Sequence, residues 1–238
     1  MWLYESIETR IISKNSEMLK SGVNYIRHLV IESNKLELFI LLSLLYLLSA
    51  ILINEYVLND ELYYRSLGSQ LSLPVIDELI RFRNKWQWIS YLGIPVILAI
   101  KFLIVSTFLS MGAIVAGHKL TFRQIFAMAM VAESVYLSAN LITTGNILLS
   151  DIKSLEDLNL SLFSLASLVS ESNIEQYFYV PLQSISIFLI IYILYLSYCY
   201  RIITGFPFRQ SLILILSTYG TAFVMWTILI MYLLISYA

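Results

Sequence analysis

The chain has little of what soluble domains and most enzymes use. Its 238 residues include one cysteine, Cys199, and only 13% charged residues, against about 25% in a typical soluble domain. A single cysteine excludes an intrachain disulfide, and its place in an apolar run predicts ordinary packing. The net charge of −1 provides no broad basic surface, so we expect no nucleic-acid partner.

Catalytic motifs are missing as well. The two histidines, His28 and His118, form no His-Glu-x-x-His, and the chain contains no Gly-x-Ser-x-Gly and no phosphate-binding glycine loop. We therefore expect no enzyme, no cofactor and no metal site. The first 36 residues carry charges at nearly every turn and lack the compact apolar core of a secretory signal, so the amino terminus is expected to remain.

What the chain has instead is long apolar runs. Hydrophobic residues make up 59% of it and the mean hydropathy is +0.78. A membrane-spanning helix needs about 20 apolar residues. Five stretches come close to that length: 38–57, 89–117, 124–144, 177–200 and 211–237. The sequence therefore predicts an all-α polytopic membrane bundle with five spans, preceded by an amphipathic amino-terminal segment, residues 1–37, that is cytoplasmic.

The distribution of Lys and Arg orients these spans. With five spans the chain ends lie on opposite sides, and the positive-inside rule places the side richer in Lys and Arg in the cytoplasm. The amino-terminal side carries Arg10, Lys14, Lys20, Arg27, Lys35, Lys119, Arg123, Arg201 and Arg209, whereas the other side carries Arg65, Arg81, Arg83, Lys85 and Lys153. We expect an integral protein of a bacterial inner membrane, with a cytoplasmic amino terminus and Ala238 outside.

The two long connections, 55–88 and 145–176, are too apolar to be simple linkers. Pro74 suits the first position of a helix. In the second connection Leu158, Leu162, Leu165 and Val169 follow the spacing of a helix stripe. Both connections are predicted to hold helices at the outer interface. The amino-terminal segment predicts an amphipathic helix or pair of helices on the cytoplasmic leaflet, or a helical cap packed on the bundle.

One pattern occurs twice at a constant offset of 86 residues. Tyr91, Pro95, Phe102-Leu103-Ile104 and Phe122-Arg123-Gln124 recur as Tyr177, Pro181, Phe188-Leu189-Ile190 and Phe208-Arg209-Gln210. Fixed-period similarity is typical of repeat architectures, so we interpret the pattern as a duplicated membrane hairpin, with each proline at the outer start of a span. Two unrelated hairpins that share similar interface residues are the alternative.

Two ionisable residues stand out inside the spans, and such residues are functional candidates because burying their charge is costly. Counted from a turn near residue 120, Lys101 and Glu133 differ in depth by about 9 Å at 1.5 Å per residue, which a lysine stem can partly bridge. The two residues are therefore candidates for a proton or ion relay, or for a polar-ligand site, between spans two and three. The alternative is a snorkelling Lys101 and a Glu133 that is protonated or bonded to a neighbouring hydroxyl.

Five basic residues mark the two short turns: His118, Lys119, Arg123, Arg201 and Arg209. They are candidates for binding lipid phosphates or a cytosolic partner. The alternative is that they only snorkel and set the topology.

The segment Gly117-His118-Lys119-Leu120-Thr121-Phe122-Arg123-Gln124, with five spans around it, resembles the Yip-domain family over residues 38–237. The resemblance implies an outward carboxyl end, and in eukaryotic members a role in vesicle traffic with small GTPases. We therefore expect a non-enzymatic integral membrane protein that organises membrane or recruits partners, with the lipid bilayer and a protein on the cytoplasmic face or within a membrane complex as partners. The alternative is a transporter or permease subunit that uses Lys101 and Glu133 and needs a separate ATPase.

Overall fold

The computed structural model describes residues 21–158, 163–168 and 176–237, and the regular elements in these residues are helical. Among these residues, five helices are long and apolar enough to cross a membrane. They comprise Lys35–Tyr56, Leu73–Val115, Phe122–Leu149, Ile187–Thr204 and Phe208–Ser236. The prediction of an all-α chain is confirmed, and so is that of five helices able to span a membrane.

Helix α5 (Phe122–Ala132) is the centre of the bundle, and every side chain from Ala127 to Ala132 is buried. Its alanines at 127, 129 and 132 let neighbouring backbones approach closely, as small residues do between membrane helices. Thr121 begins the helix with a capping box, in which its side chain and that of Gln124 bond each other's backbone N–H groups. The helix α5 contacts α2, α4, α6 and α8.

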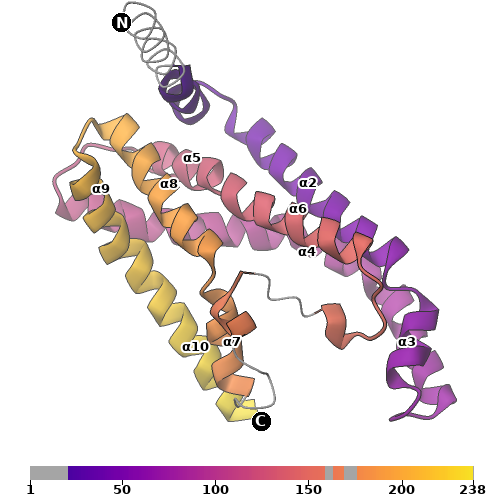
Figure 1. Ribbon diagram of the computed structural model, residues 1–238. Coiled ribbons are helices and arrows are strands. Elements are labelled where there is room, and N and C mark those ends of the chain that lie inside the picture. Colours follow the sequence, from indigo (N-terminus) through magenta and orange to yellow (C-terminus); the bar gives the residue numbers. More distant parts are fainter. Residues whose placement is uncertain (1–20, 159–162, 169–175, 238) are drawn as a thin grey trace, which may run out of the picture.

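Three long helices lie side by side around this centre. The helices α2 (Lys35–Tyr56) and α6 (Ser134–Leu149) pack together, and α4 (Leu73–Val115) contacts both α2 and α5. Figure 1 shows α2, α4 and α6 running from the end of the molecule near α5 toward the short helix α3 (Asp60–Leu67), which packs on the start of α4.

The helix that contains the second predicted span begins earlier than that span, because α4 starts at Leu73 rather than near residue 89. Pro74 does open a helix, but that helix continues without a break into the span. Its 43 residues extend about 65 Å, twice the thickness of a bilayer core. Pro95, predicted at the outer start of a span, is therefore not in the first turn of its helix. It lies inside α4, where a proline removes one backbone hydrogen bond.

The fourth predicted span, 177–200, is divided in two. The helix α7 (Gln176–Ser184) ends before Ser186, and α8 (Ile187–Thr204) begins after it. Between the two helices the chain bonds to the loop at residues 163–165 instead of continuing as a helix. The N–H of Leu165 donates to the carbonyl of Ile185, and the N–H of Ile187 donates to that of Phe163. The Ser186 side chain caps α8. Pro181 therefore lies within α7, apart from the span itself.

The second connection does not form the predicted continuous helix. Its described residues contain two short 3₁₀ turns, η1 (Glu156–Leu158) and η2 (Leu165–Leu168), and Phe163 has a φ of 62°, which ends any helix. Leu162 and Val169 of the predicted stripe lie outside the described residues. Near η1, the backbone N–H groups of Lys153 and Ser154 donate to Asp157 and hold the pKa of its carboxyl below the usual range.

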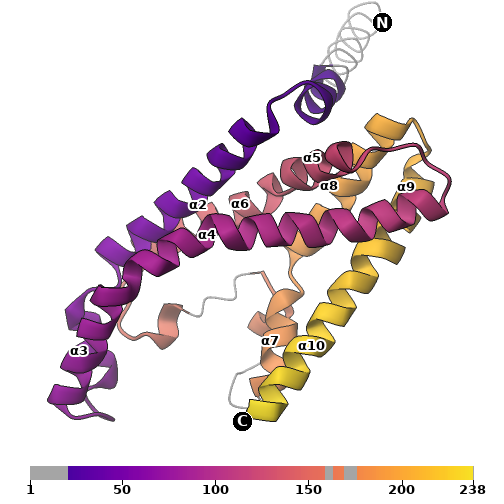
Figure 2. The same cartoon turned by 180° about the vertical axis from the view of Figure 1, so that it is seen from behind.

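The last span is also interrupted. The helix α9 (Phe208–Ile215) passes through a π-helical turn, η4 (Leu216–Gly220), into α10 (Thr221–Tyr237). Figure 2 shows α10 diverging from α4 away from the end where α9 lies, with α7 beside α10. Single π turns of this kind often occur at functional positions within helices.

The chain before α2 is helical over residues 21–31. Within it Ile26 and Val30 are buried in the main hydrophobic core. Of the two alternatives for this segment, its described part therefore packs on the bundle. Residues 1–20 of the amino-terminal segment lie outside the described residues.

Candidate functional site: a buried lysine–glutamate pair

The described residues bring Lys101 and Glu133 together in the middle of the bundle. The ammonium Nζ of Lys101 on α4 lies 2.7 Å from Oε1 of Glu133. This contact fits the depth argument made from sequence, since the lysine stem bridges the offset. The Glu133 side chain is 1% exposed and that of Lys101 is 34% exposed, so the carboxylate is fixed inside the bundle and the lysine reaches it from the bundle surface.

Local backbone geometry positions Glu133 at the junction of α5 and α6. Its N–H is shared between the carbonyls of Ala129 and Met130, which tightens the helix by one 3₁₀-type bond at this residue. The helix then continues, because the N–H of Leu137 donates to the carbonyl of Glu133. Glu133, which is buried, thus lies where the regular helix is interrupted.

Four tyrosines surround the pair. The hydroxyl of Tyr46 on α2 donates to Oε1 of Glu133 at 2.9 Å, and the Lys101 ammonium lies 4.2 Å from the ring centroid of Tyr136. Beyond Tyr136, its hydroxyl lies 3.4 Å from that of Tyr219 in η4, and the ring of Tyr192 packs on both. The pair therefore links α2, α4 and the α5–α6 junction directly, and the tyrosines extend the contact to α8 and η4.

Sequence reasoning missed these tyrosines. The chain has 17 of them, so nothing in composition selects four. The one available signal was that Tyr219 is the counterpart of Glu133 at the offset of 86 residues, and the two belong to the same cluster through Tyr136.

The pair is incompletely satisfied. Among the described residues, neither Oε2 of Glu133 nor the hydroxyl of Tyr192 has a hydrogen-bond partner, although both are buried. An unpaired polar atom in a low-dielectric interior is costly. Chemically, the site is a neutralised ion pair with a spare acceptor, which can fasten three helices or take up a proton or a small hydrogen-bond donor.

The five basic candidates lie at one end of the molecule, which we call the basic end. It comprises the α4–α5 turn, the α8–α9 turn, the start of α2 and residues 21–31. The Arg27 side chain donates to the carbonyl of Ile202, which ties residues 21–31 to the end of α8.

Four of the candidates have no acidic partner. Lys119, Arg123, Arg201 and Arg209 are exposed and form no ion pair with any acidic side chain that the structure describes. Cations that lack protein counter-ions are free to meet anions from outside.

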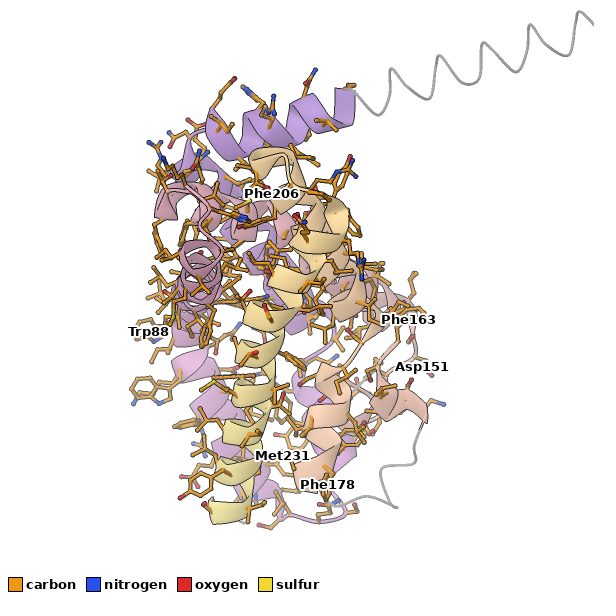
Figure 3. All side chains as sticks on the ribbon, turned by 90° about the vertical axis from the view of Figure 1, so that its left-hand side faces the viewer. Trp88, Asp151, Phe163, Phe178, Phe206 and Met231 are labelled. Carbon is orange, nitrogen blue, oxygen red and sulfur yellow. The ribbon has the colours of Figure 1, made fainter. Side chains whose placement is uncertain are left out.

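His118 is held within the protein. Its ring stacks on Phe206 with the centroids 4.0 Å apart, and its Nδ1 hydrogen-bonds the hydroxyl of Tyr200, which is fully buried. The Phe206 label near the upper end of Figure 3 marks this position. His118 thus ties the α4–α5 turn to the α8–α9 turn, a role that sequence reasoning could not find, because Tyr200 lies 82 residues away along the chain.

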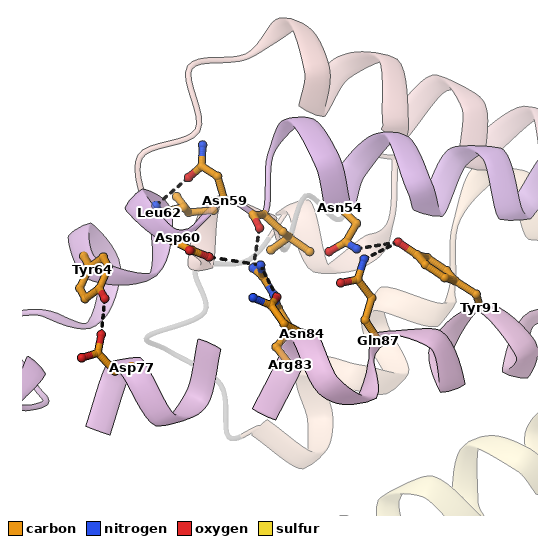
Figure 4. A network of polar contacts seen from close by, with 11 residues as sticks. Asn54, Asn59, Asp60, Leu62, Tyr64, Asp77, Arg83, Asn84, Gln87 and Tyr91 are labelled. Atoms are coloured by element: carbon orange, nitrogen blue, oxygen red, sulfur yellow. Dashed lines mark hydrogen bonds and ion pairs between the residues drawn. The ribbon is translucent and has the colours of Figure 1, made fainter. Parts of the chain in front are cut away.

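The opposite end has its own polar network, shown in Figure 4. Asn54 of α2 and Gln87 of α4 both donate to the hydroxyl of Tyr91, at 2.6 and 2.5 Å. Arg83 bonds the carbonyl of Leu58 and lies 3.4 Å from Asp60. At this end Arg65, Arg83 and Lys153 each lie beside an acidic side chain, unlike the four exposed cations of the basic end.

No family model, curated protein or solved structure matches the chain. The fold and the site therefore define the protein only by class: a helical membrane protein with five potential spans and a buried lysine–glutamate pair.

Proposed function

We propose that the chain is a non-enzymatic integral membrane protein whose basic end faces the cytoplasm and recruits acidic partners or organises anionic membrane. The observation that carries the proposal is the set of four exposed cations at that end that form no ion pair with a described acidic side chain. They come from two turns that are far apart in sequence, since Arg123 and Arg201 are separated by 78 residues. A Yip-like organisation, with the amino terminus inside and Ala238 outside, is part of this proposal.

Charge asymmetry supports this orientation. The described residues of the basic end include six Lys and Arg but two acidic residues, of which Glu32 is paired with His28. The cations are Arg27, Lys35, Lys119, Arg123, Arg201 and Arg209, and the acids are Glu32 and Glu37. The positive-inside rule places the end with net positive charge in the cytoplasm. Each Lys or Arg near an anionic inner leaflet adds about 1 kcal/mol of binding free energy.

We also infer that the two hairpins descend from one duplicated unit. In support, the turns after α4 and α8 each contain a glycine with positive φ, Gly117 at 72° and Gly205 at 77°, and the helices that follow begin at the equivalent Phe122 and Phe208. An interfacial position for the first long connection likewise remains part of the proposal, with α3 and the start of α4 as the helices concerned.

Replacing the four unpaired cations Lys119, Arg123, Arg201 and Arg209 by Gln is expected to abolish co-purification of partners and anionic lipid from native membranes. The matched control replaces four cations of the other end, Arg65, Arg81, Lys85 and Lys153, by Gln, which preserves the same net charge change. A tag after Ala238 reports whether topology is kept. Equal recovery of partners and lipids with both variants, at unchanged topology, contradicts the proposal. Deleting residues 1–35 is a poorer test, because Ile26 and Val30 belong to the core.

A transporter or permease subunit is the second candidate, favoured by the unpaired Oε2 of the buried Glu133. Such a function requires the carboxylate to exchange a proton or bind a substrate during transport. Proton flux into vesicles with an encapsulated pH-sensitive dye tests it, with Glu133→Gln as the variant. If the chain is a transporter, wild type should carry a proton flux that the variant loses. Equal rates in wild type, variant and empty vesicles would contradict the transporter function.

A further inference from the structure

A groove lies between the last turns of α4 and the α9–η4–α10 helix, and its chemistry differs along its length. Its volume is about 570 Å³. The walls are formed by apolar side chains, and the end nearest the turns holds His118 and Gln210. The lining residues of α4 run from Phe108 to Ala116, so the groove follows that helix for about 12 Å.

The hydroxyl groups in this groove do not make it polar. Ser217, Thr218 and Thr221 all donate to carbonyls of their own helix. These hydroxyls therefore have no proton left to donate to a ligand. The methyl groups of the two threonines remain for packing. The groove is an apolar channel with a polar mouth.

The mouth lies at the basic end. Lys119 directly follows His118, and Arg209 directly precedes Gln210. Both cations are exposed and have no ion pair with a described acidic side chain. Two unpaired cations that adjoin the residues of the mouth in sequence, together with an apolar channel, match a molecule that has an anionic head and a hydrocarbon tail.

We propose that this groove binds one anionic phospholipid, with an acyl chain along the groove beside the contact of α4 with η4 and the phosphate between Lys119 and Arg209. Burying a chain here gains little over the surrounding bilayer, because lipid tails are as apolar as the groove. Selectivity therefore comes from the two cations, and the groove fixes where the lipid sits. The proposal rests on the proposed function in one respect, that the basic end meets an anionic leaflet.

The test is native mass spectrometry of the full chain purified in micelles that contain equal amounts of phosphatidylglycerol and phosphatidylcholine. Wild type is expected to retain one phosphatidylglycerol. Ala116→Phe and Ser217→Phe fill the groove from its two walls and should release that lipid. The control Ile97→Phe adds the same ring on an exposed face of α4, away from the groove, and should keep it. The thermal unfolding temperature of each variant checks its fold.

A second variant separates the head from the tail. Lys119→Gln with Arg209→Gln should lower the preference for phosphatidylglycerol over phosphatidylcholine roughly 30-fold, the effect of two basic groups beside an anion, while lipid still enters the groove. Retention of phosphatidylglycerol by both folded groove-filled variants overturns the proposal. So does equal retention of the two lipids by wild type, or competition by inorganic phosphate, which would show a phosphate site rather than a lipid site.

Failure of this proposal is distinguishable from failure of the proposed function. If the groove-filled variants release the lipid but recruit the same partners as wild type, the groove is confirmed as a lipid site that recruitment does not need. If they keep the lipid while the variant of all four cations loses its partners, the groove is refuted and the proposed function stands.

Discussion

Lys101→Met is expected to destabilise the protein by about 3 kcal/mol, the usual effect of removing one partner from a buried ion pair. The variant leaves the Glu133 carboxylate 1% exposed with only the Tyr46 hydroxyl as a donor among the described residues. The carboxylate must then take up a proton or rearrange. The measurement is the apparent unfolding temperature in detergent, with Lys85→Met as a control, since Lys85 is an exposed lysine of the same helix.

The double variant Lys101→Met with Glu133→Gln decides what this loss means. Replacing both members of a buried pair by neutral groups is often close to neutral for stability, so the double variant should recover most of the loss. If Lys101→Met unfolds at the wild-type temperature, the ion pair contributes nothing and Lys101 only snorkels. If the double variant is as unstable as the single one, the coupling between the two residues is absent.

Gly112→Ala is expected to destabilise the protein by about 2 kcal/mol, within the range for overpacked cores. A Cβ at residue 112 would lie 2.2 Å from Cγ2 of Thr218 on the facing η4. Thr218 cannot simply rotate away, because its hydroxyl donates to the carbonyl of Leu214 at 2.7 Å. Helix propensity alone predicts the opposite sign, since alanine stabilises a helix by roughly 1 kcal/mol over glycine.

Thr218→Ser is the matched rescue. It removes the methyl group that collides and keeps the hydroxyl that bonds Leu214, and the nearest remaining atoms lie at 3.4 and 3.6 Å. In this background Gly112→Ala should be neutral or stabilising, so the sign of its effect on the unfolding temperature reverses. Equal destabilisation in both backgrounds would contradict the close approach of α4 and η4.

The sequence predicted the spans because their signal is local. Apolar length identifies a membrane helix without knowledge of its neighbours, and the five runs correspond to five helices. The ends were less predictable. Residues 73–88 continue α4 instead of lying apart, and the fourth span is cut at Ser186 because Phe163 and Leu165 bond the chain there. The bonds at Ser186 join two separate segments of the chain, 163–165 and 185–187. Hydrophobic periodicity within one segment does not report such contacts.

The candidate site shows the same division. The pairing of Lys101 with Glu133 followed from counting residues to a shared turn, because helix rise converts sequence distance into depth. The partners Tyr46, Tyr192 and Tyr219 depended on which helices are neighbours and how each is rotated. The fixed place of His118 against Tyr200 and Phe206 was hidden for the same reason.

We propose that function resides at the basic end and that the buried pair fastens the helices. Co-purification from native membranes tests this most directly, with the variant of all four unpaired cations compared against the double variant Lys101→Met with Glu133→Gln. We expect the first variant to lose protein partners and anionic lipid, whereas the second, which neutralises the buried pair, retains both. Retention by the first variant and loss by the second would contradict it.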